Sequence, residues 1–384
     1  MSDRNSTTLG DIAEIISGST PKSNVNDYWD GDIAWATPTD LSKLENKEIL
    51  TTARLLTQQG LESCSARILP PDSVLFTSRA PIGHIAINKI PMATNQGFKS
   101  FIPDTSKVDP NYLYYWLKEK KTYIQHLGRG ATFKEVSKQI VASITITLPP
   151  LEEQRRIAKI SDKSNQIKKL FNKKSLLLQN LRKSIFFNFF GNPITNPYKW
   201  EEGPISSFTS CIVPGRDKPK SFSGNIPWIT TDELPNNFKI SNSSKKIGLT
   251  LNEIEEVRAK IIPKNSVIMS CVGNLGLTSI TRKEVVMNQQ LHSYQCSEDI
   301  LPEFLATYLP FRKPWMKAKA SQTTLPYLNK GKCNAIPIFL PPLEVQKEFV
   351  QVLNHILLQE EIISQINKKI FHLNNSISQE LLGT

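Results

Sequence analysis

The sequence lacks the features that mark an exported, membrane-bound or disulfide-stabilised protein. It contains no run of about 18 apolar residues, so no membrane-spanning helix is expected. Its polar start, MSDRNSTTLGD, lacks the apolar core of a signal peptide, and we therefore expect a cytoplasmic protein. Its five cysteines are scattered and never stand in C-x-x-C spacing, which predicts reduced thiols, with neither a zinc cage nor a disulfide framework.

The chain also lacks a recognisable catalytic motif. It contains no G-x-G-x-x-G, no G-x-x-x-x-G-K-[ST] and no H-E-x-x-H, and its five histidines are isolated from one another. TNPYKW (residues 195–200) faintly resembles the Asn-Pro-Pro-aromatic motif of amino-methyltransferases, but it lacks the second proline and we interpret it as a turn. We therefore predict no catalytic residue, no metal ligand and no cofactor bound by this chain.

Acidic residues are too few to balance the basic ones. The formal net charge is +12, of which residues 1–192 contribute +8 and the remainder +4. Both halves are basic without a charged tail, which favours a polyanionic partner, most simply nucleic acid. A basic surface that binds nothing remains the alternative on charge alone.

A long internal repeat organises the chain. SVLFTSRAPIGHIAI (residues 73–87) is matched by SVIMSCVGNLGLTSI (266–280), and ITLPPLEEQ (146–154) is matched by IFLPPLEVQ (338–346). The offset is 193 residues in the first pair and 192 in the second. A single one-residue slip between such distant matches predicts a duplicated domain and not a solenoid of short repeats.

Each copy of the repeat divides into a globular part and a helical part. The first part is dense in Pro, Gly, Asn and Thr with short β-rich runs, which predicts a mostly β domain with a few short helices. The second part has no internal Pro or Gly, carries Glu152 or Glu344 in its first turn and closes on Gly191 or Gly383, as helices do. The predicted class is α+β, with two mostly β globular domains related by an internal pseudo-twofold repeat and separated by two long antiparallel coiled-coil helices. The predicted boundaries are residues 1–150 and 193–342 for the globular domains and 151–192 and 343–384 for the spacer helices.

The two helical segments share an apolar seam. Its spacing alternates between three and four residues, the rhythm of a coiled coil, and so long and narrow a seam predicts one partner helix. About 38 residues at ~1.5 Å each would make a rod of roughly 57 Å. If the two copies are related by a pseudo-twofold axis, the helices pack antiparallel and place one globular domain near each end; in the alternative, each helix packs only on its own domain. The predicted seam residues are Ile157, Ile160, Ile167, Phe171, Leu178 and Leu181 in the first segment and Phe349, Val352, Ile356, Ile363, Ile366, Ile370 and Leu373 in the second.

Comparison of the copies separates retained residues from divergent ones. We interpret as structural the retained pairs Gly31 and Gly224, Trp35 and Trp228, Gly83 and Gly276, Asn95 and Asn288, and Gln96 and Gln289. The divergent positions include polar residues: Arg79 against Val272, Pro81 against Asn274, Lys99 against His292, and Lys134 against Pro326. Two such domains would read two different short DNA sequences through hydrogen bonds to base edges, while surrounding Lys and Arg would hold phosphates.

Together these features resemble the specificity subunit of a type I restriction-modification system. The resemblance rests on paired β-rich domains with G-x-I-x-W, S-V-L-x-[ST]-S-R-x-x-I-G and N-Q-x-F/L, each followed by L-P-P-L-x-x-Q and a long helix ending in Gly. It covers essentially the whole chain. The second copy departs from it, because SCVGNLG lacks the arginine of SRAPIG, so a contact by Arg79 is not expected to be shared.

The resemblance implies a DNA-binding subunit that is not catalytic by itself. Each globular domain would be a target recognition domain for one half of a bipartite, asymmetric site in double-stranded DNA, and the helix pair would set the gap. Two methylation subunits would dock on the helices, bring S-adenosylmethionine and flip an adenine in each half-site, and motor-nuclease subunits would bring ATP and Mg²⁺ for restriction in phage defence. The side chains predicted to contact DNA are Lys22, Arg79, Lys99, Arg129, Lys134, Lys138, Lys220, Asn274, His292, Lys317, Lys319, Gln322 and Lys330.

Three other interpretations remain open from the sequence. The chain could serve a related system, such as a type IIB-like or other defence methyltransferase, with different partners. It could be a self-contained nuclease or methyltransferase with a cryptic site, in which case the purified chain would turn over DNA alone. It could also be a protein–protein adaptor, in which case DNA binding would be absent or insensitive to salt.

Overall fold

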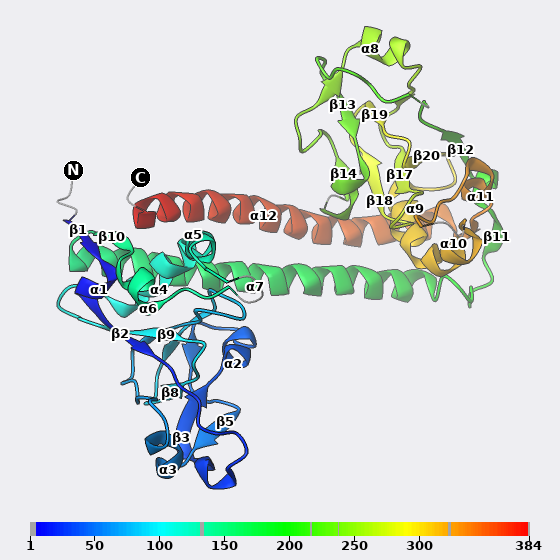
Figure 1. Ribbon diagram of the computed structural model, residues 1–384. Helices are drawn as coiled ribbons and strands as arrows, with labels where there is room; N and C mark the ends of the chain where they lie inside the picture. The colour runs from blue at the N-terminus through cyan, green and yellow to red at the C-terminus, as the bar shows by residue number, and fades with distance from the viewer. Residues whose placement is uncertain (1–4, 131–133, 216, 237, 322–323, 383–384) are drawn as a thin grey trace. The chain divides into compact units, whose positions relative to one another are not determined.

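The computed structural model describes residues 5–130, 134–215, 217–236, 238–321 and 324–382. The chain separates into two compact units, residues 1–171 with 366–384 and residues 172–365. Each unit holds one globular head and one segment of each of the two long helices (Figure 1). We call residues 5–150 the first head and residues 193–342 the second head.

The first head is built on a five-stranded sheet whose central strand is buried on both faces. Val74 and Phe76 of that strand pack in one hydrophobic cluster and Leu75 in another, which explains why the strand is a continuous apolar run. A three-stranded sheet of β5 (Arg54–Leu56), β3 (Trp29–Ala36) and β8 (Ala93–Thr94) and a pair of β1 (Asn5–Thr8) with β10 (Thr145–Leu148) complete the strands. The five-stranded sheet has the spatial order β2 (Ala13–Ser17), β9 (Lys99–Pro103), β6 (Val74–Phe76), β7 (Ile85–Asn88) and β4 (Glu48–Ile49).

Short helices cover this sheet. The longest, α4 (Pro110–Glu119), begins where Asp109 accepts hydrogen bonds from two backbone amides of the first turn, and it buries Tyr112 and Trp116. The others are α1 (Leu9–Ile12), η1 (Asn26–Tyr28), α2 (Pro38–Ser42), α3 (Gln58–Glu62), α5 (Lys121–His126) and α6 (Lys138–Ala142).

The second head repeats this architecture, as the internal repeat predicts. Its five-stranded sheet has the same order, β12 (Thr209–Ile212), β20 (Leu291–Cys296), β17 (Val267–Ser270), β18 (Thr278–Thr281) and β14 (Lys239–Ile240). A second sheet contains β15 (Gly248–Leu249), β13 (Ile226–Ile229), β19 (Val285–Met287) and β16 (Ile261–Ile262), and β11 (Glu201–Pro204) pairs with β21 (Pro337–Leu340). Its helices are η2 (Ile205–Ser207), η3 (Thr231–Asn236), α8 (Leu251–Glu256), α9 (Pro302–Tyr308), η4 (Leu309–Arg312), α10 (Lys313–Lys319) and α11 (Lys330–Asn334).

The retained glycine and tryptophan pairs have the structural roles expected of them. Gly83 (φ +97°) and Gly276 (φ +77°) lie in the left-handed region, in the turns that join β6 to β7 and β17 to β18. Trp35 and Trp228 are buried, each in a hydrophobic cluster of its own head. The repeat is therefore a repeat of structure as well as of sequence.

The L-P-P-L-x-x-Q segments fasten each head to the start of a 40-residue helix, α7 (Leu151–Phe190) or α12 (Leu343–Leu382). The Gln154 side chain is buried, accepts a hydrogen bond from the Asp109 amide (2.9 Å) and donates to the carbonyls of Lys107 (3.0 Å) and Pro149 (2.9 Å). Gln346 makes the same three bonds, to Leu301, Asp299 and Pro341, at 2.8–2.9 Å. Pro-Pro stops the preceding strand, and the glutamine satisfies three backbone groups that the junction leaves without partners.

Within each unit the two long helices pack antiparallel, as predicted. In the first unit, Arg156 of α7 pairs with Glu380 of α12 (3.1 Å), and Ser164 bonds Asn374 (2.6 Å). In the second unit, Lys174 bonds Gln359 (3.1 Å), while the rings of Phe186 and Phe190 lie against Phe349. α7 ends before Gly191 (φ +72°), and Gly383, the other predicted stop, lies outside the described residues.

Each heptad of the predicted seam has two positions, a first one and a second one three residues later, such as Ile157 and Ile160. The observed seam differs from the predicted one at the second of these positions. The first position is as predicted: Ile157, Phe349, Ile356, Ile363 and Ile370 are buried, and Phe171 and Leu178 are half-buried. At the second position the seam passes one residue further along, so Ile160 and Ile366 are half-buried and Ile167, Leu181, Val352 and Leu373 are exposed. The residues that face inward there are mostly polar, namely Ser161, Ser175, Arg182, Glu360, Asn367 and Asn374.

The difference has a physical reason. Residues three and four positions after a seam residue both lie near the partner helix, and the sequence pattern favours whichever of the two is apolar. Three of these polar side chains bond across the pair: Asn374 with Ser164 (2.6 Å), and Arg182 with Glu360 (3.4 Å). The hydroxyl of Ser161 instead donates to the carbonyl of Ile157 in its own helix (2.9 Å). The seam is therefore a row of apolar residues alternating with polar ones.

Candidate nucleic-acid interface

Three loops of the first head meet where β6 ends. The turn 77–83 follows β6, the turn 95–98 precedes β9, and the third loop is held by an antiparallel bridge between Arg129 and Glu135. The amide of Ser78 donates to the carbonyl of Gly97 (2.7 Å), and the amide of Val136 donates to the carbonyl of Ser78 (3.0 Å). These bonds bring together residues that are 19 and 58 positions apart in the sequence.

This convergence gathers four of the predicted DNA contacts. Arg79, Lys99, Arg129 and Lys134 all lie on or beside the three loops. Glu135 lies among them, with a carboxylate 3.5 Å from the Arg79 guanidinium and 3.3 Å from the Lys99 ammonium. The Lys99 side chain is only 10% exposed, so its ammonium faces Glu135 and not the solvent. Arg79, Arg129 and Lys134 are the side chains of this group that remain accessible.

The second head forms the same three loops with different side chains. The amide of Gly273 donates to the carbonyl of Pro326 (2.8 Å), and the amide of Cys271 donates to the carbonyl of Gln290 (2.9 Å). Val272 lies against Tyr327 where Arg79 lies against Glu135 in the first head. The second head therefore presents a neutral surface where the first presents an ion pair.

His292 is not at the surface, contrary to its prediction as a DNA contact. It lies on the inner part of β20, is 2% exposed, and its Nε2 is 3.3 Å from Oδ1 of Asn334. Burial lowers the pKa of His292 to about 4, so the ring is neutral at pH 7. Its position corresponds to that of Lys99, which is also buried; divergence at this position reflects two different interior partners.

The remaining predicted contacts are exposed and lie on several elements. Asn274, on the turn after β17, accepts a hydrogen bond from the ammonium of Lys313 (2.5 Å). Lys220 stands on a separate loop, and Gln322 lies outside the described residues. The other exposed ones are Lys22 before β3, Lys138 at the start of α6, Lys317 and Lys319 on α10, and Lys330 at the start of α11.

The carboxylate of Glu253 holds the loop that carries Lys220. Glu253 on α8 accepts hydrogen bonds from the hydroxyl of Ser221 (2.5 Å), the amide of Ser223 (3.1 Å) and the amide of Thr250 (2.8 Å). These bonds, of which the one from Ser221 contributes most, lower the pKa of Glu253 to about 2.

Glu135, Lys313 and Glu253 were not predicted from the sequence, because nothing local in the sequence indicates which distant residue each one contacts.

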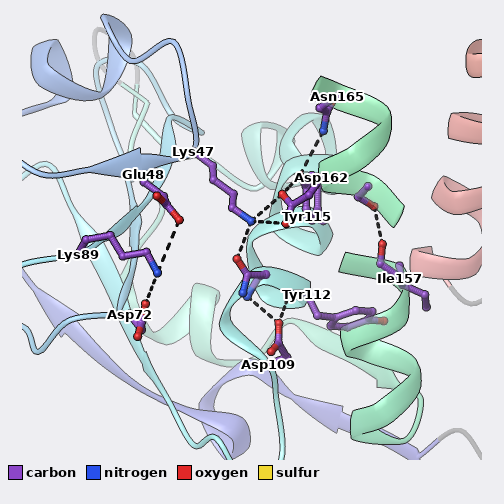
Figure 2. A network of polar contacts seen from close by, with 12 residues as sticks. Lys47, Glu48, Asp72, Lys89, Asp109, Tyr112, Tyr115, Ile157, Asp162 and Asn165 are labelled. Atoms are coloured by element: carbon purple, nitrogen blue, oxygen red, sulfur yellow. Dashed lines mark hydrogen bonds and ion pairs between the residues drawn. The ribbon is translucent and has the colours of Figure 1, made fainter. Parts of the chain in front are cut away.

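A polar network joins the first head to α7 (Figure 2). The ammonium of Lys47 donates to both carboxylate oxygens of Asp162 (2.6 and 2.7 Å) and to Asn111 (2.6 Å). The hydroxyl of Tyr115 donates to Asp162 (2.6 Å) and accepts from Asn165 (3.3 Å). Burial raises the pKa of Tyr115, so the phenol stays protonated and donates. The network fixes α4 and the loop before β4 on the helix.

Neither a metal centre nor a membrane-spanning segment is found in the described part of the chain. Among those residues, no group of three or more His, Cys, Asp or Glu could hold a metal ion. None of the described helices is both long enough and apolar enough to cross a bilayer.

Comparison with known proteins places this architecture in a family. The family model described as the type I restriction modification DNA specificity domain matches residues 1–180 and again residues 197–372. A type I restriction enzyme specificity subunit (MjaIX) of Methanocaldococcus jannaschii is 28% identical, over 97% of this chain and 90% of that protein. The EcoR124I/EcoR124II specificity subunit of Escherichia coli is 26% identical, over 41% of this chain and 39% of that protein.

Solved structures share the fold. The S subunit of a type I restriction-modification system from M. genitalium superposes with a TM-score of 0.67 at 11% identity, covering 99% of this chain and 96% of that one. A chain from a structure of type I R-M complex assembly and conformational transition gives a TM-score of 0.54 at 18% identity, covering 99% and 97%.

Proposed function

This chain belongs to the family of type I restriction modification DNA specificity domains, and from that premise we propose that it reads a bipartite DNA site and performs no catalysis itself. One observation carries the proposal. The two heads build the same three-loop framework and place different side chains on it, Arg79 and Glu135 in one and Val272 and Tyr327 in the other. A common scaffold with unlike surfaces suits two unlike half-sites.

The basic side chains support DNA as the ligand. Net charge is +12, and exposed basic side chains lie on the loops of the first head, as Arg129 and Lys134 do, and on α10 of the second head, as Lys317 and Lys319 do. Such residues hold phosphates and fix the register of a protein on DNA, while neutral groups such as Asn274 are suited to base edges.

The complex we propose contains two methylation subunits and, for restriction, motor-nuclease subunits. The methylation subunits would dock on the helix pair, supply S-adenosylmethionine and flip an adenine in each half-site. The motor-nuclease subunits would supply ATP and Mg²⁺, and the assembly would act in the cytoplasm against phage DNA. This chain would recognise the DNA sequence and bind no cofactor.

The methylome of a cell that carries the intact system tests the proposal. We expect methyl-adenine in a bipartite motif with a fixed gap. Replacing residues 193–342 by another recognition domain should change one half of the motif and leave the other intact. A change in both halves would contradict independent heads, and DNA turnover by the purified chain alone would contradict a non-catalytic role.

A second experiment tests the spacer role of the helices. Inserting four residues near Asn172 in α7 should lengthen the accepted gap or abolish methylation, because it shifts one helix against the seam of the other. The half-sites themselves should be unchanged in any motif that survives. An unchanged gap would mean that the helices do not set the spacing.

A further inference from the structure

One dipeptide, Asn-Gln, occupies the same turn in both heads, and its asparagine has a visible structural role. The amide oxygen of Asn95 accepts a hydrogen bond from the Gly97 amide (2.9 Å), and that of Asn288 accepts from the Gln290 amide (3.2 Å). The backbone amide of Asn95 donates to the carbonyl of Ala36 (3.0 Å). This is how an asparagine side chain shapes a turn, and it explains why both copies retain it.

The glutamine that follows has no such role. Gln96 and Gln289 are exposed at the tip of the turn. Within the described residues, neither side chain has a hydrogen-bond partner, in contrast to Gln290, which accepts from Thr231 (3.1 Å). The turn does not need these glutamines, so the interpretation of Gln96 and Gln289 as structural residues has no support in the contacts they make.

Both glutamines stand on the loops where the heads otherwise diverge. The carbonyl of Gly97, next to Gln96, accepts from Ser78, which precedes Arg79. In the second head, the carbonyl of Gln290, next to Gln289, accepts from Cys271, which precedes Val272. An identical exposed side chain thus lies beside residues that differ between the two heads.

We propose that Gln96 and Gln289 make the same contact in the two half-sites, donating a carboxamide hydrogen bond to a phosphate of the DNA backbone. The proposal rests on the proposed function. Two heads with unlike surfaces read unlike bases, and the sugar–phosphate backbone is the feature that any two half-sites share whatever their sequence. Side-chain amides are ordinary donors to phosphate, and such contacts fix the register without reading sequence.

The test uses the complete complex with its methylation subunits and three variants of Gln96, with Gln59→Ala and Gln59→Glu as controls. Gln59 is an exposed glutamine of α3 and belongs to none of the three loops. Gln96→Ala should weaken binding to the cognate duplex about 5–10-fold, the loss of one hydrogen bond. Gln96→Glu should weaken it further through repulsion by the phosphate. Gln96→Lys should retain the affinity and steepen the dependence of log K on log salt by about 0.9.

The same substitutions of Gln289 should have the same effects, and the methylated motif should be unchanged in all variants. Melting temperatures should equal that of the parent chain, because the turn is built by Asn95 and Asn288. The proposal is overturned if Gln96→Ala binds like Gln59→Ala, or if Gln96→Lys binds as weakly as Gln96→Ala. A motif that loses one base would also overturn it, since that would reveal a base contact. If the parent complex yields no bipartite motif, the proposed function itself fails.

Discussion

The carboxylate of Asp162 contributes to the attachment of the first head to α7, and replacing it gives a quantitative prediction. Asp162 accepts hydrogen bonds from the Lys47 ammonium and the Tyr115 hydroxyl at 2.6–2.7 Å. Asp162→Asn keeps the size of the side chain and removes its charge. Lys47 then keeps Asn111 as a neutral acceptor but loses its counterion.

The expected loss of stability follows from how deeply Lys47 and Asp162 are buried. The Lys47 side chain is 17% exposed and that of Asp162 33%, so the pair is only partly screened by water. A hydrogen bond to a charged group contributes about 1.5–3 kcal/mol, and two such bonds with partial solvation give an expected loss of about 3 kcal/mol in the free energy of unfolding. For a unit of 150–250 residues this corresponds to a fall in Tm of about 6–12 °C.

Thermal unfolding followed by circular dichroism measures the loss, and hydrogen exchange at the amides of α4 localises it. The matched control is Glu14→Gln. Glu14 forms a 2.6 Å ion pair with Arg67, the same distance as in the network, but both side chains are more than half exposed. An exposed pair contributes about 0.2–1 kcal/mol, so the control should change Tm by only a few degrees.

A double-mutant cycle isolates the pair. With Lys47→Met as the second change, the coupling energy should be about 1.5–3 kcal/mol. The reasoning is refuted if Asp162→Asn costs no more than Glu14→Gln, or if the coupling lies below about 0.5 kcal/mol. The half-site read by the first head should be unchanged, because the network does not touch the three loops.

Three further predictions concern the heads. The pKa of Glu253 lies at about 2, below its ordinary 4.5, so the stabilisation it provides is complete above pH 4.5 and disappears as pH falls toward 2; Glu253→Gln should flatten stability in that window, as urea unfolding at several pH values would show. The pKa of His292 is about 4, below its ordinary 6.5, so the second head should lose stability as pH falls from 6.5 toward 4, and His292→Gln should remove this dependence; an unchanged slope would contradict its burial as a neutral ring. Gly18→Ala should lower the free energy of unfolding of the first head by about 2–4 kcal/mol, because an added Cβ would stand 1.9 Å from the carbonyl oxygen of Asn95. Gly331→Ala in α11 is the control: beyond its own helix backbone and chain neighbours, the nearest atom to an added Cβ is Oδ1 of Asn329 at 3.6 Å, so the change should be neutral or slightly stabilising in thermal unfolding.

Much of the fold could be predicted from the sequence, because the two copies of the internal repeat can be compared with each other. The repeat marked Gly83 and Gly276 as turn residues, and both have positive φ. The Pro-Pro boundary and the unbroken helical segments placed the start of each long helix. The seam was predicted only in part, because the apolar pattern alone cannot decide between positions three and four residues along when the inward residue is polar, as Asn374 is, which bonds Ser164.

The candidate site could be predicted much less well. The loops that carry Arg79, Gln96 and Glu135 are joined by backbone bonds between segments that are far apart in the sequence, and no local pattern reports this. Divergence between the copies predicts exposure, and this prediction is wrong for Lys99 and His292, which are 8% and 2% exposed. Those residues lie inside their heads and differ because their partners differ, a carboxylate in one case and an amide in the other.

The junction made by Gln154 and Gln346 bears on how such a chain changes its target over generations. Every bond of these two side chains runs to backbone atoms, so the junction is indifferent to the side chains of the head that it fastens. A genetic crossover within the L-P-P-L-x-x-Q segment would therefore transplant a head together with a working joint. New targets would arise by exchange of whole heads, with the backbone bonds of this junction kept intact.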